Sequence, residues 1–362
     1  MASVSNCEKI GTLVRRDRMS NKTLGNLFDA TRNSINIMRL LAALAVIYGH
    51  ASAVTGRGPE DIFLQFVGYK FLGGVAVDVF FVLSGFLVTA SAMGGKGIKY
   101  FLVSRALRIY PALLVCVALL VFLLGPLLTV SDEYWQATQT WRYLAGNATA
   151  YCTEYFLPGV FSGLHDRAIN GSLWSLQIEV RLYLIVGISS IVGVFINKRV
   201  FNTLFFAVIV AGYFAPEVVL KVFGPENHRH VAQMFMIGSF SWINRQSIPI
   251  GPEILFMLLI FAASLHGTDR FGFAYVLLLP YLVFYVAVGQ WGVWFNKCGD
   301  LSYGTYLYGW PCQQLVYSIA PDIGNTLHAM LAALLALFMA FLSWRLVENP
   351  SLRLKKLYWP GR

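Results

Sequence analysis

Charged residues are scarce in this chain, and this scarcity sets its class. Asp, Glu, Lys and Arg make up 13% of the 362 residues, whereas 57% are hydrophobic. The mean hydropathy is +0.61, and soluble domains are typically about 25% charged. The composition therefore excludes an ordinary soluble enzyme and indicates a membrane protein with long apolar runs.

Cysteines are few, and their positions exclude two kinds of site. The five are Cys7, Cys116, Cys152, Cys298 and Cys312. We expect only Cys152 in an outer loop, so no disulfide framework is predicted, and no CxxC pair indicates a metal site. The first 35 residues also lack the apolar core of a signal peptide, so the first span is expected to start membrane insertion itself.

The net charge of +10 is better explained by topology than by nucleic acid. With the N-terminus inside, most Lys and Arg fall on the inner side of the predicted spans, which is typical of cytoplasmic loops. The inner clusters are Arg15–Arg18, Lys96–Arg108, Lys198–Arg199 and Arg353–Lys356. Aromatic residues are not interleaved with them, so we expect no nucleic-acid partner.

The apolar runs predict an all-α, polytopic membrane helix bundle of about ten transmembrane helices. Each run is close to the ~20 residues that cross a bilayer core of ~30 Å. The runs are 37–55, 72–92, 109–130, 174–196, 199–218, 229–244, 250–267, 272–290, 300–320 and 325–346.

The domain organisation follows from these runs. We expect a flexible cytoplasmic N-terminal tail over 1–33, a transmembrane domain over 34–350 and a cytoplasmic C-terminal tail over 351–362. The long outer loop at about 131–173 is rich in aromatic residues. Loops of this length are usually functional or disordered, and the aromatic residues fit either an ordered cap or anchoring at the membrane interface.

Two ionisable residues lie eleven positions apart in the first run, Arg39 and His50. At about 100° per residue they share a helix face to within about 20°, and about 16 Å of helix axis separates them. Ionisable groups inside a span are costly and mark a functional site by default. His50 is expected toward the outer face.

Two acids are expected at a similar depth to His50, on other spans. Asp78 lies about 9 Å and Glu179 about 8 Å below the outer edge by helix rise. An imidazole beside a carboxylate is an oriented general base. The alternative is structural: Glu179 neutralised by Arg181, or Asp78 joining helices.

A basic cluster is predicted at the opposite, cytoplasmic mouth. Arg105 and Arg108 project from one side of a helical turn, and Arg39 lies on the inner part of the first span. Guanidinium forks suit phosphate, although positive-inside topology and lipid headgroups explain the same pattern. The gap to His50 is about 15–20 Å by helix rise, which fits a long donor such as acyl-coenzyme A.

Six segments in order resemble the acyltransferase-3 family of integral membrane acyltransferases, over residues 34 to 352. They are Arg39–His50, Gly74–Phe86, Arg105–Pro111, Trp174–Glu179, Leu301–Tyr308 and Val347–Pro350. The resemblance implies O-acylation, usually O-acetylation, of a carbohydrate on the far side of the membrane. It also implies acyl-CoA as co-substrate, no tightly bound cofactor, Arg105 and Arg108 as the donor grip, and His50 as the catalytic residue.

The remaining roles are hypotheses on the same pattern. Asp78 or Glu179 would hold the imidazole of His50, and Ser84 and Gly85 would leave room for the pantetheine arm. The candidates for binding the acceptor, a carbohydrate or lipid-linked glycan, are Trp174, Ser175 and Tyr183. No metal site is expected.

Three further expectations complete the reading. His228 and His230 are expected in a solvated outer loop. The membrane is expected to be a bacterial inner membrane, with both termini cytoplasmic. The main rival function is a proton-coupled transporter of a small or lipid-linked substrate, because buried His, Asp, Glu and Arg also line transport pathways.

Overall fold

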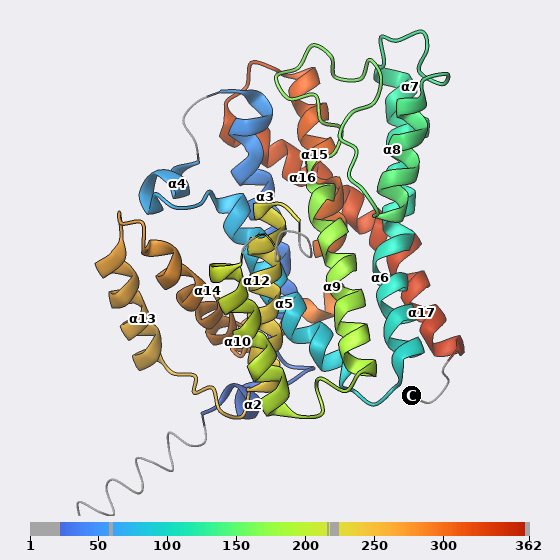
Figure 1. Cartoon of the computed structure of the whole chain (residues 1–362). Helices are drawn as coiled ribbons and strands as arrows, with labels where there is room; N and C mark the ends of the chain where they lie inside the picture. Colours follow the sequence, from blue (N-terminus) through green and yellow to red (C-terminus); the bar gives the residue numbers. More distant parts are fainter. Residues whose placement is uncertain (1–21, 58–60, 216, 218–223, 359–362) are drawn as a thin grey trace, which may run out of the picture.

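The computed structural model describes residues 22–57, 61–215, 217 and 224–358, and within them every predicted run is helical (Figure 1). No strand occurs in these residues; one isolated bridge joins Thr23 and Pro249. The helices that follow the runs are α3 (Ile35–Thr55), α5 (Leu72–Ala92), α6 (Ile98–Leu119), α9 (Trp174–Ile191), α10 (Lys198–Phe214), α12 (Glu226–Ile243), α13 (Pro252–Leu265), α14 (Phe271–Ala287), α15 (Ser302–Ile319) and α16 (Asn325–Ser343).

Several shorter elements extend or connect these helices. A π-helical segment, η1 (Leu120–Leu124), joins α6 to α7 (Gly125–Leu128), and another, η4 (Trp344–Glu348), joins α16 to α17 (Asn349–Tyr358). The remaining short elements of the described residues are α2 (Leu24–Leu27), α4 (Ile62–Val67), α8 (Thr138–Thr149), η2 (Gly171–Leu173) and η3 (Val293–Cys298).

Among the described residues, four helices are long and apolar enough to cross a membrane. They are Ile35–Thr55, Leu72–Ala92, Ile98–Leu128 and Asn325–Lys355, and Pro252–Leu265 and Phe271–Ala287 are shorter apolar helices. Large apolar side chains such as Ile188, Phe206 and Phe256 are exposed on the bundle surface, as expected where lipid is the solvent. The chain is a helical membrane protein, and the number of ten spans stays a prediction.

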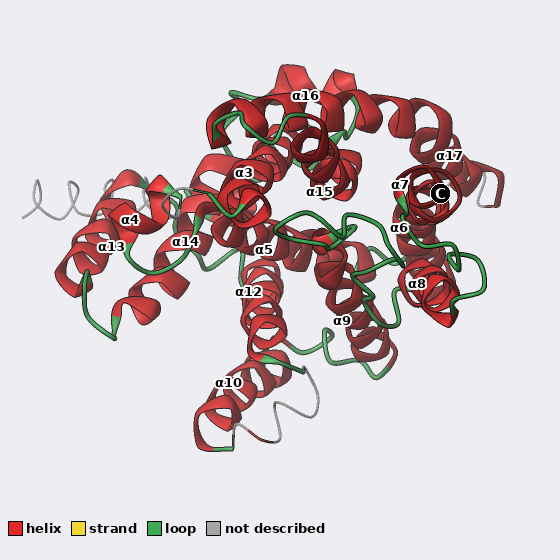
Figure 2. Cartoon of the chain, turned by 90° about the horizontal axis from the view of Figure 1, so that it is seen from above, coloured by secondary structure: helices red, strands yellow, loops and turns green. Residues whose placement is uncertain are grey.

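The helices run alternately between two ends of the bundle (Figure 1). The lower end in Figure 1 holds α2, the turn between α5 and α6, and the turn between α9 and α10. The upper end holds α7 and the loop at 150–170. α3 and α15 pack together in the middle of the molecule, with α16 outside them (Figure 2).

Glycines bring α5 and α12 into direct backbone contact. A Cβ at Gly85 would lie 1.9 Å from the Phe235 carbonyl oxygen, and one at Gly238 would lie 2.1 Å from that of Val82. Small residues at helix contacts are the usual way for membrane helices to pack closely. The expectation that Gly85 leaves room for a substrate arm is therefore wrong, because the α12 backbone fills that space.

The loop at 150–170 is ordered by buried hydrogen bonds to α15. Asn170 donates to the Leu307 carbonyl over 2.9 Å, Trp310 donates to that of Ala168 over 3.1 Å, and Gln314 donates to the same Ala168 oxygen over 2.9 Å. These contacts fix the loop to α15 at the upper end of the bundle.

Part of the expected N-terminal tail also packs on the bundle. Residues 1–21 lie outside the described residues. From residue 22 onward the chain is folded: Leu24 is fully buried, and its backbone N–H donates to the Ile248 carbonyl over 2.8 Å.

Candidate functional site

His50 lies near the upper end of α3 between two aromatic rings. The rings of Phe71 and Trp310 are edge-on to the imidazole, with centroids 5.0 and 5.1 Å away. Nδ1 lies 2.8 Å from the Val46 carbonyl oxygen. Because a carbonyl only accepts, Nδ1 carries the proton, and the lone pair is at Nε2.

No hydrogen bond joins His50 to a carboxylate in the described part of the chain. Asp78 and Glu179 were expected beside it, and each has other partners. That expectation is wrong because depth along a helix fixes height and not direction: Asp78 faces α12 and α14, and Glu179 faces Ser84 of α5 and the arginine side of the bundle.

Asp78 is fully buried and accepts three hydrogen bonds on one oxygen. Lys70 Nζ lies 2.7 Å, His230 Nε2 3.0 Å and Tyr275 Oη 2.5 Å from Oδ2. Oδ1 has no partner among the described residues. The cluster joins α5, α12, α14 and the segment before α5. Burial lowers the pKa of Lys70, and the ion pair with Asp78 opposes that shift.

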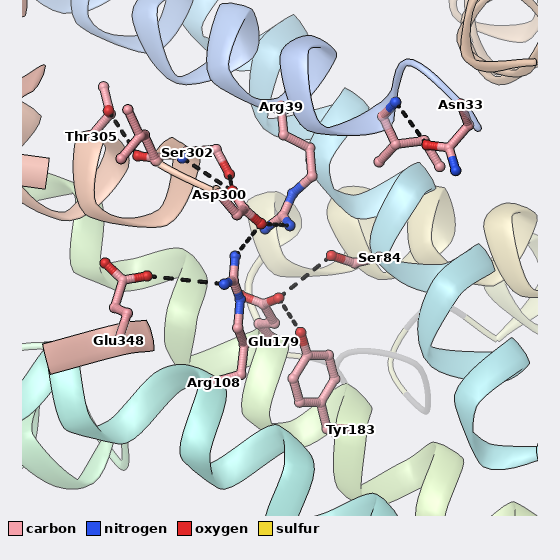
Figure 3. A network of polar contacts seen from close by, with 12 residues as sticks. Asn33, Arg39, Ser84, Arg108, Glu179, Tyr183, Asp300, Ser302, Thr305 and Glu348 are labelled. Atoms are coloured by element: carbon pink, nitrogen blue, oxygen red, sulfur yellow. Dashed lines mark hydrogen bonds and ion pairs between the residues drawn. The ribbon is translucent and has the colours of Figure 1, made fainter. Parts of the chain in front are cut away.

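The arginines expected at the inner mouth converge on a residue that sequence reasoning missed, Asp300. Arg39 Nη1 lies 2.7 Å from Asp300 Oδ2, and Arg108 Nη2 donates to the same oxygen (Figure 3). Arg108 Nη1 also lies 3.9 Å from Glu348 Oε2. The three side chains at Asp300 are 13–19% exposed, so this is a largely buried ionic cluster.

Glu179 belongs to the arginine side of the site. Its Oε1 accepts hydrogen bonds from Tyr183 over 2.5 Å and Ser84 over 3.5 Å (Figure 3). No ion pair links it to Arg181, whose side chain is exposed. Ser84, Glu179 and Tyr183 line one cavity together with Arg39 and Arg108.

Arg105 is separate from the Asp300 cluster. Its guanidinium lies over the ring of Tyr183, 5.9 Å from the centroid, and its Nε is buried without a hydrogen-bond partner among the described residues. Since Tyr183 lines the cavity of Arg39 and Arg108, Arg105 is next to that cavity and holds unused donor capacity.

Two cavities lie side by side between the helices. The arginine cavity, about 550 Å³ including open solvent, is lined by Arg39, Ser84, Arg108, Glu179 and Tyr183 among others. The histidine cavity, about 1130 Å³ including open solvent, is lined by His50, Lys70, Trp174, His230 and Tyr306 among others.

Val77 and Tyr306 line both cavities and form the wall between them. Tyr306 Oη lies 2.6 Å from Ser175 Oγ, and it donates to the Ser172 carbonyl over 3.0 Å. The three predicted acceptor-binding residues therefore do not lie in one cavity. Trp174 lines the histidine cavity, Tyr183 lines the arginine cavity, and Ser175 contacts Tyr306 in the wall between them.

His228 and His230 are on the first turns of α12, not in a solvated loop as expected. His228 is 9% exposed, and its ring stacks on Trp174 with centroids 5.5 Å apart. His230 faces the histidine cavity and Asp78. The sequence did contain a clue to the role of His230. This residue lies in the apolar run that begins at residue 229, and an acid lies at a matching depth on another span.

Comparison with known proteins gives the class of this protein. The acyltransferase-3 family model, described as "Acyltransferase domain", matches residues 32–345. A protein named O-acetyl transferase from Shigella phage Sf6 is 29% identical over 342 residues, which are 88% of this chain and 95% of that protein. Nodulation protein 10 of Rhizobium leguminosarum bv. viciae is 26% identical over 366 residues, 90% and 94% of the two chains. No solved structure matches.

The helical bundle that holds the arginine and histidine cavities is therefore that of a membrane enzyme of the acyltransferase class. Because the family model covers most of the chain, the protein belongs to the acyltransferase-3 family. The resemblance noted in the six sequence segments is confirmed.

Proposed function

We propose that the protein moves an acetyl group from acetyl-CoA to a hydroxyl of a carbohydrate acceptor. The donor enters from the cytoplasm at the arginine cavity, and the acceptor binds in the histidine cavity on the outer face. The observation that carries this proposal is the pair of adjoining cavities with chemically different linings. The name of the phage relative, O-acetyl transferase, supports acetyl as the group transferred.

Phosphates of the donor have two kinds of arginine available. Arg105 offers unpaired donor capacity beside Tyr183. Arg39 and Arg108 are already joined by Asp300, so they shape the mouth of the cavity and are not free forks for a phosphate. The pantetheine arm would follow the arginine cavity past Ser84 to the wall formed by Val77 and Tyr306.

His50 supplies the reactive nitrogen on the other side of this wall. Its Nδ1–H is held by the Val46 carbonyl, so the lone pair of Nε2 is free to take a hydroxyl proton or the acetyl group itself. In the overall reaction the carbonyl–sulfur bond breaks, a carbonyl–oxygen bond forms, and the hydroxyl proton ends on the CoA thiol. A positioned base contributes about 10²–10⁴-fold in rate.

The acceptor side is lined for a polar, ring-bearing molecule. Trp174, Tyr69 and Phe71 offer aromatic surface, while Asn227, Glu226 and Lys70 offer hydrogen-bonding groups. A carbohydrate, free or lipid-linked, matches this combination. The proposed location is a bacterial inner membrane with ten spans and both termini cytoplasmic, which places the histidine cavity on the outer face.

Proteoliposomes loaded with labelled acetyl-CoA test this function. The acceptor is the surface polysaccharide of the cells that express the protein, with its acetyl groups removed by mild alkali and supplied outside. We expect label in the polysaccharide only when donor and acceptor are on opposite sides. Polysaccharide that stays unlabelled with the purified wild-type protein would refute the proposal.

A further inference from the structure

The histidine cavity contains a second imidazole with a free nitrogen. His230, on α12, lines the same cavity as His50 and is only partly buried. Its Nε2 is bound to Asp78 Oδ2 at 3.0 Å, and its Nδ1 has no hydrogen-bond partner among the described residues. Lys70 Nζ, which can only donate, lies 2.7 Å from the same oxygen, so Asp78 Oδ2 is the acceptor in this cluster. The His230 proton is therefore at Nε2 and the lone pair at Nδ1.

The two histidines differ in what supports them. His50 donates to a neutral backbone carbonyl, whereas His230 donates to a buried carboxylate. A carboxylate on the far nitrogen stabilises the imidazolium that forms when the near nitrogen takes a proton. A neutral carbonyl gives the Nδ1–H of His50 no such charge stabilisation, so the carboxylate support is specific to His230.

We propose that His230 is a second catalytic residue, the base that removes the proton from the acceptor hydroxyl, and that His50 carries the acetyl group between donor and acceptor. The proposal rests on the acetyl transfer proposed above. Asp78 is a positioning residue that acts through His230, with Lys70 and Tyr275 fixing its carboxylate.

The two half-reactions balance. In the first, His50 Nε2 attacks the thioester carbonyl, a carbon–nitrogen bond forms, the carbon–sulfur bond breaks and CoA leaves as a thiolate. In the second, the acceptor oxygen attacks the acetyl carbonyl as its proton passes to His230 Nδ1, the carbon–nitrogen bond breaks, and His50 returns to its neutral form. His230 then releases the proton, which protonates the thiolate.

Because His50 and His230 have different roles, a variant of His230 should lose the second half-reaction and keep the first. Exchange of labelled CoA into acetyl-CoA, without acceptor, reports the first half-reaction alone. Transfer to de-O-acetylated polysaccharide reports both. For His230→Ala we expect exchange within about twofold of the wild-type rate and transfer lowered by about 100-fold or more, the contribution of a positioned base. For His50→Ala we expect neither.

His228→Ala is the matched control. His228 lies two positions away on α12 and stacks on Trp174, and it does not line the histidine cavity. We expect this variant to keep most of both reactions. Added imidazole should restore transfer in His230→Ala, because the cavity can admit it, and should not change the His228→Ala rate.

Each other outcome overturns the inference. Wild-type transfer by His230→Ala would remove His230 from the chemistry. Loss of exchange together with transfer, without rescue by imidazole, would make its role structural. Transfer by the wild type without any CoA exchange would exclude an acetylated His50 while leaving the proposed function intact. A wild type that transfers nothing would refute the function itself.

Discussion

Arg39 and Asp300 are 261 positions apart in sequence, and Arg39 Nη1 donates to Asp300 Oδ2 over 2.7 Å. This contact ties the first long helix to the segment that precedes α15. Because Arg108 binds the same carboxylate oxygen, Asp300 holds two cations, one from α3 and one from α6, at one point.

Removing Asp300 should therefore destabilise the fold. Asp300→Ala removes the carboxylate that Arg39 and Arg108 share and leaves them close together, with only Glu348 at 3.9 Å from Arg108. Loss of one partner from a buried ion pair costs about 3–5 kcal/mol. We expect a lower midpoint of thermal unfolding for the purified variant in detergent. Asp322→Ala removes an exposed acid with a 3.4 Å contact to Arg57 and should leave the midpoint unchanged. Equal midpoints for the two variants would contradict the clustering.

Arg105 should affect donor binding rather than stability. Its guanidinium makes no ion pair with a described residue, and its Nε is unpartnered. We expect Arg105→Ala to raise the acetyl-CoA KM by about tenfold, since a lost charge-assisted hydrogen bond is worth about 1.5–3 kcal/mol. Arg181→Ala, at an exposed position, is the control. If the acetyl-CoA KM of Arg105→Ala equals that of the control, Arg105 does not bind the donor and serves only as a positive charge on the inner side of the membrane.

The wall between the cavities should control the passage of the acetyl group. Val77 is 5% exposed and lines both cavities, so Val77→Phe would add a ring where the thioester must pass. We expect the transfer rate to fall at least tenfold in the same labelled assay. Val79→Phe, two positions along and outside both linings, should retain activity. Normal transfer by Val77→Phe would show that the passage lies elsewhere.

The α5–α12 contact gives a stability prediction. A methyl group at Gly85 would lie 1.9 Å from the Phe235 carbonyl oxygen, and neither backbone can move without unpacking the other. Overpacking of this kind costs about 1–3 kcal/mol, so Gly85→Ala should lower the unfolding midpoint. Gly212→Ala, where the methyl meets nothing within 4 Å, is the control. A Gly85→Ala midpoint at the control value would contradict the close contact.

Hydropathy predicted the helices well because each apolar run is a local property. The boundaries moved where charge was involved: the run predicted from 109 begins as a helix at Ile98, because Lys99, Arg105 and Arg108 extend the helix beyond the apolar run. Periodicity also placed Arg39 and His50 correctly on one helix. These features depend only on neighbours in sequence.

The partners of each side chain could not be predicted in the same way. Depth along a helix does not tell which neighbour a side chain faces, so Asp78 was expected beside His50 rather than beside His230. Asp300 is the first residue of the run 300–320, and no sequence pattern pointed to it as the partner of Arg39 and Arg108. Such contacts depend on the rotation of each helix about its axis, which packing alone determines.

Acetyl transfer by His50→Ala is the most direct test of the whole account. The variant is compared with the wild type in proteoliposomes that contain equal amounts of folded protein, with labelled acetyl-CoA inside and de-O-acetylated polysaccharide outside. The account predicts that labelling of the polysaccharide falls to background, because Nε2 of His50 is the nitrogen that handles the acetyl group. Labelling at the wild-type rate would contradict it.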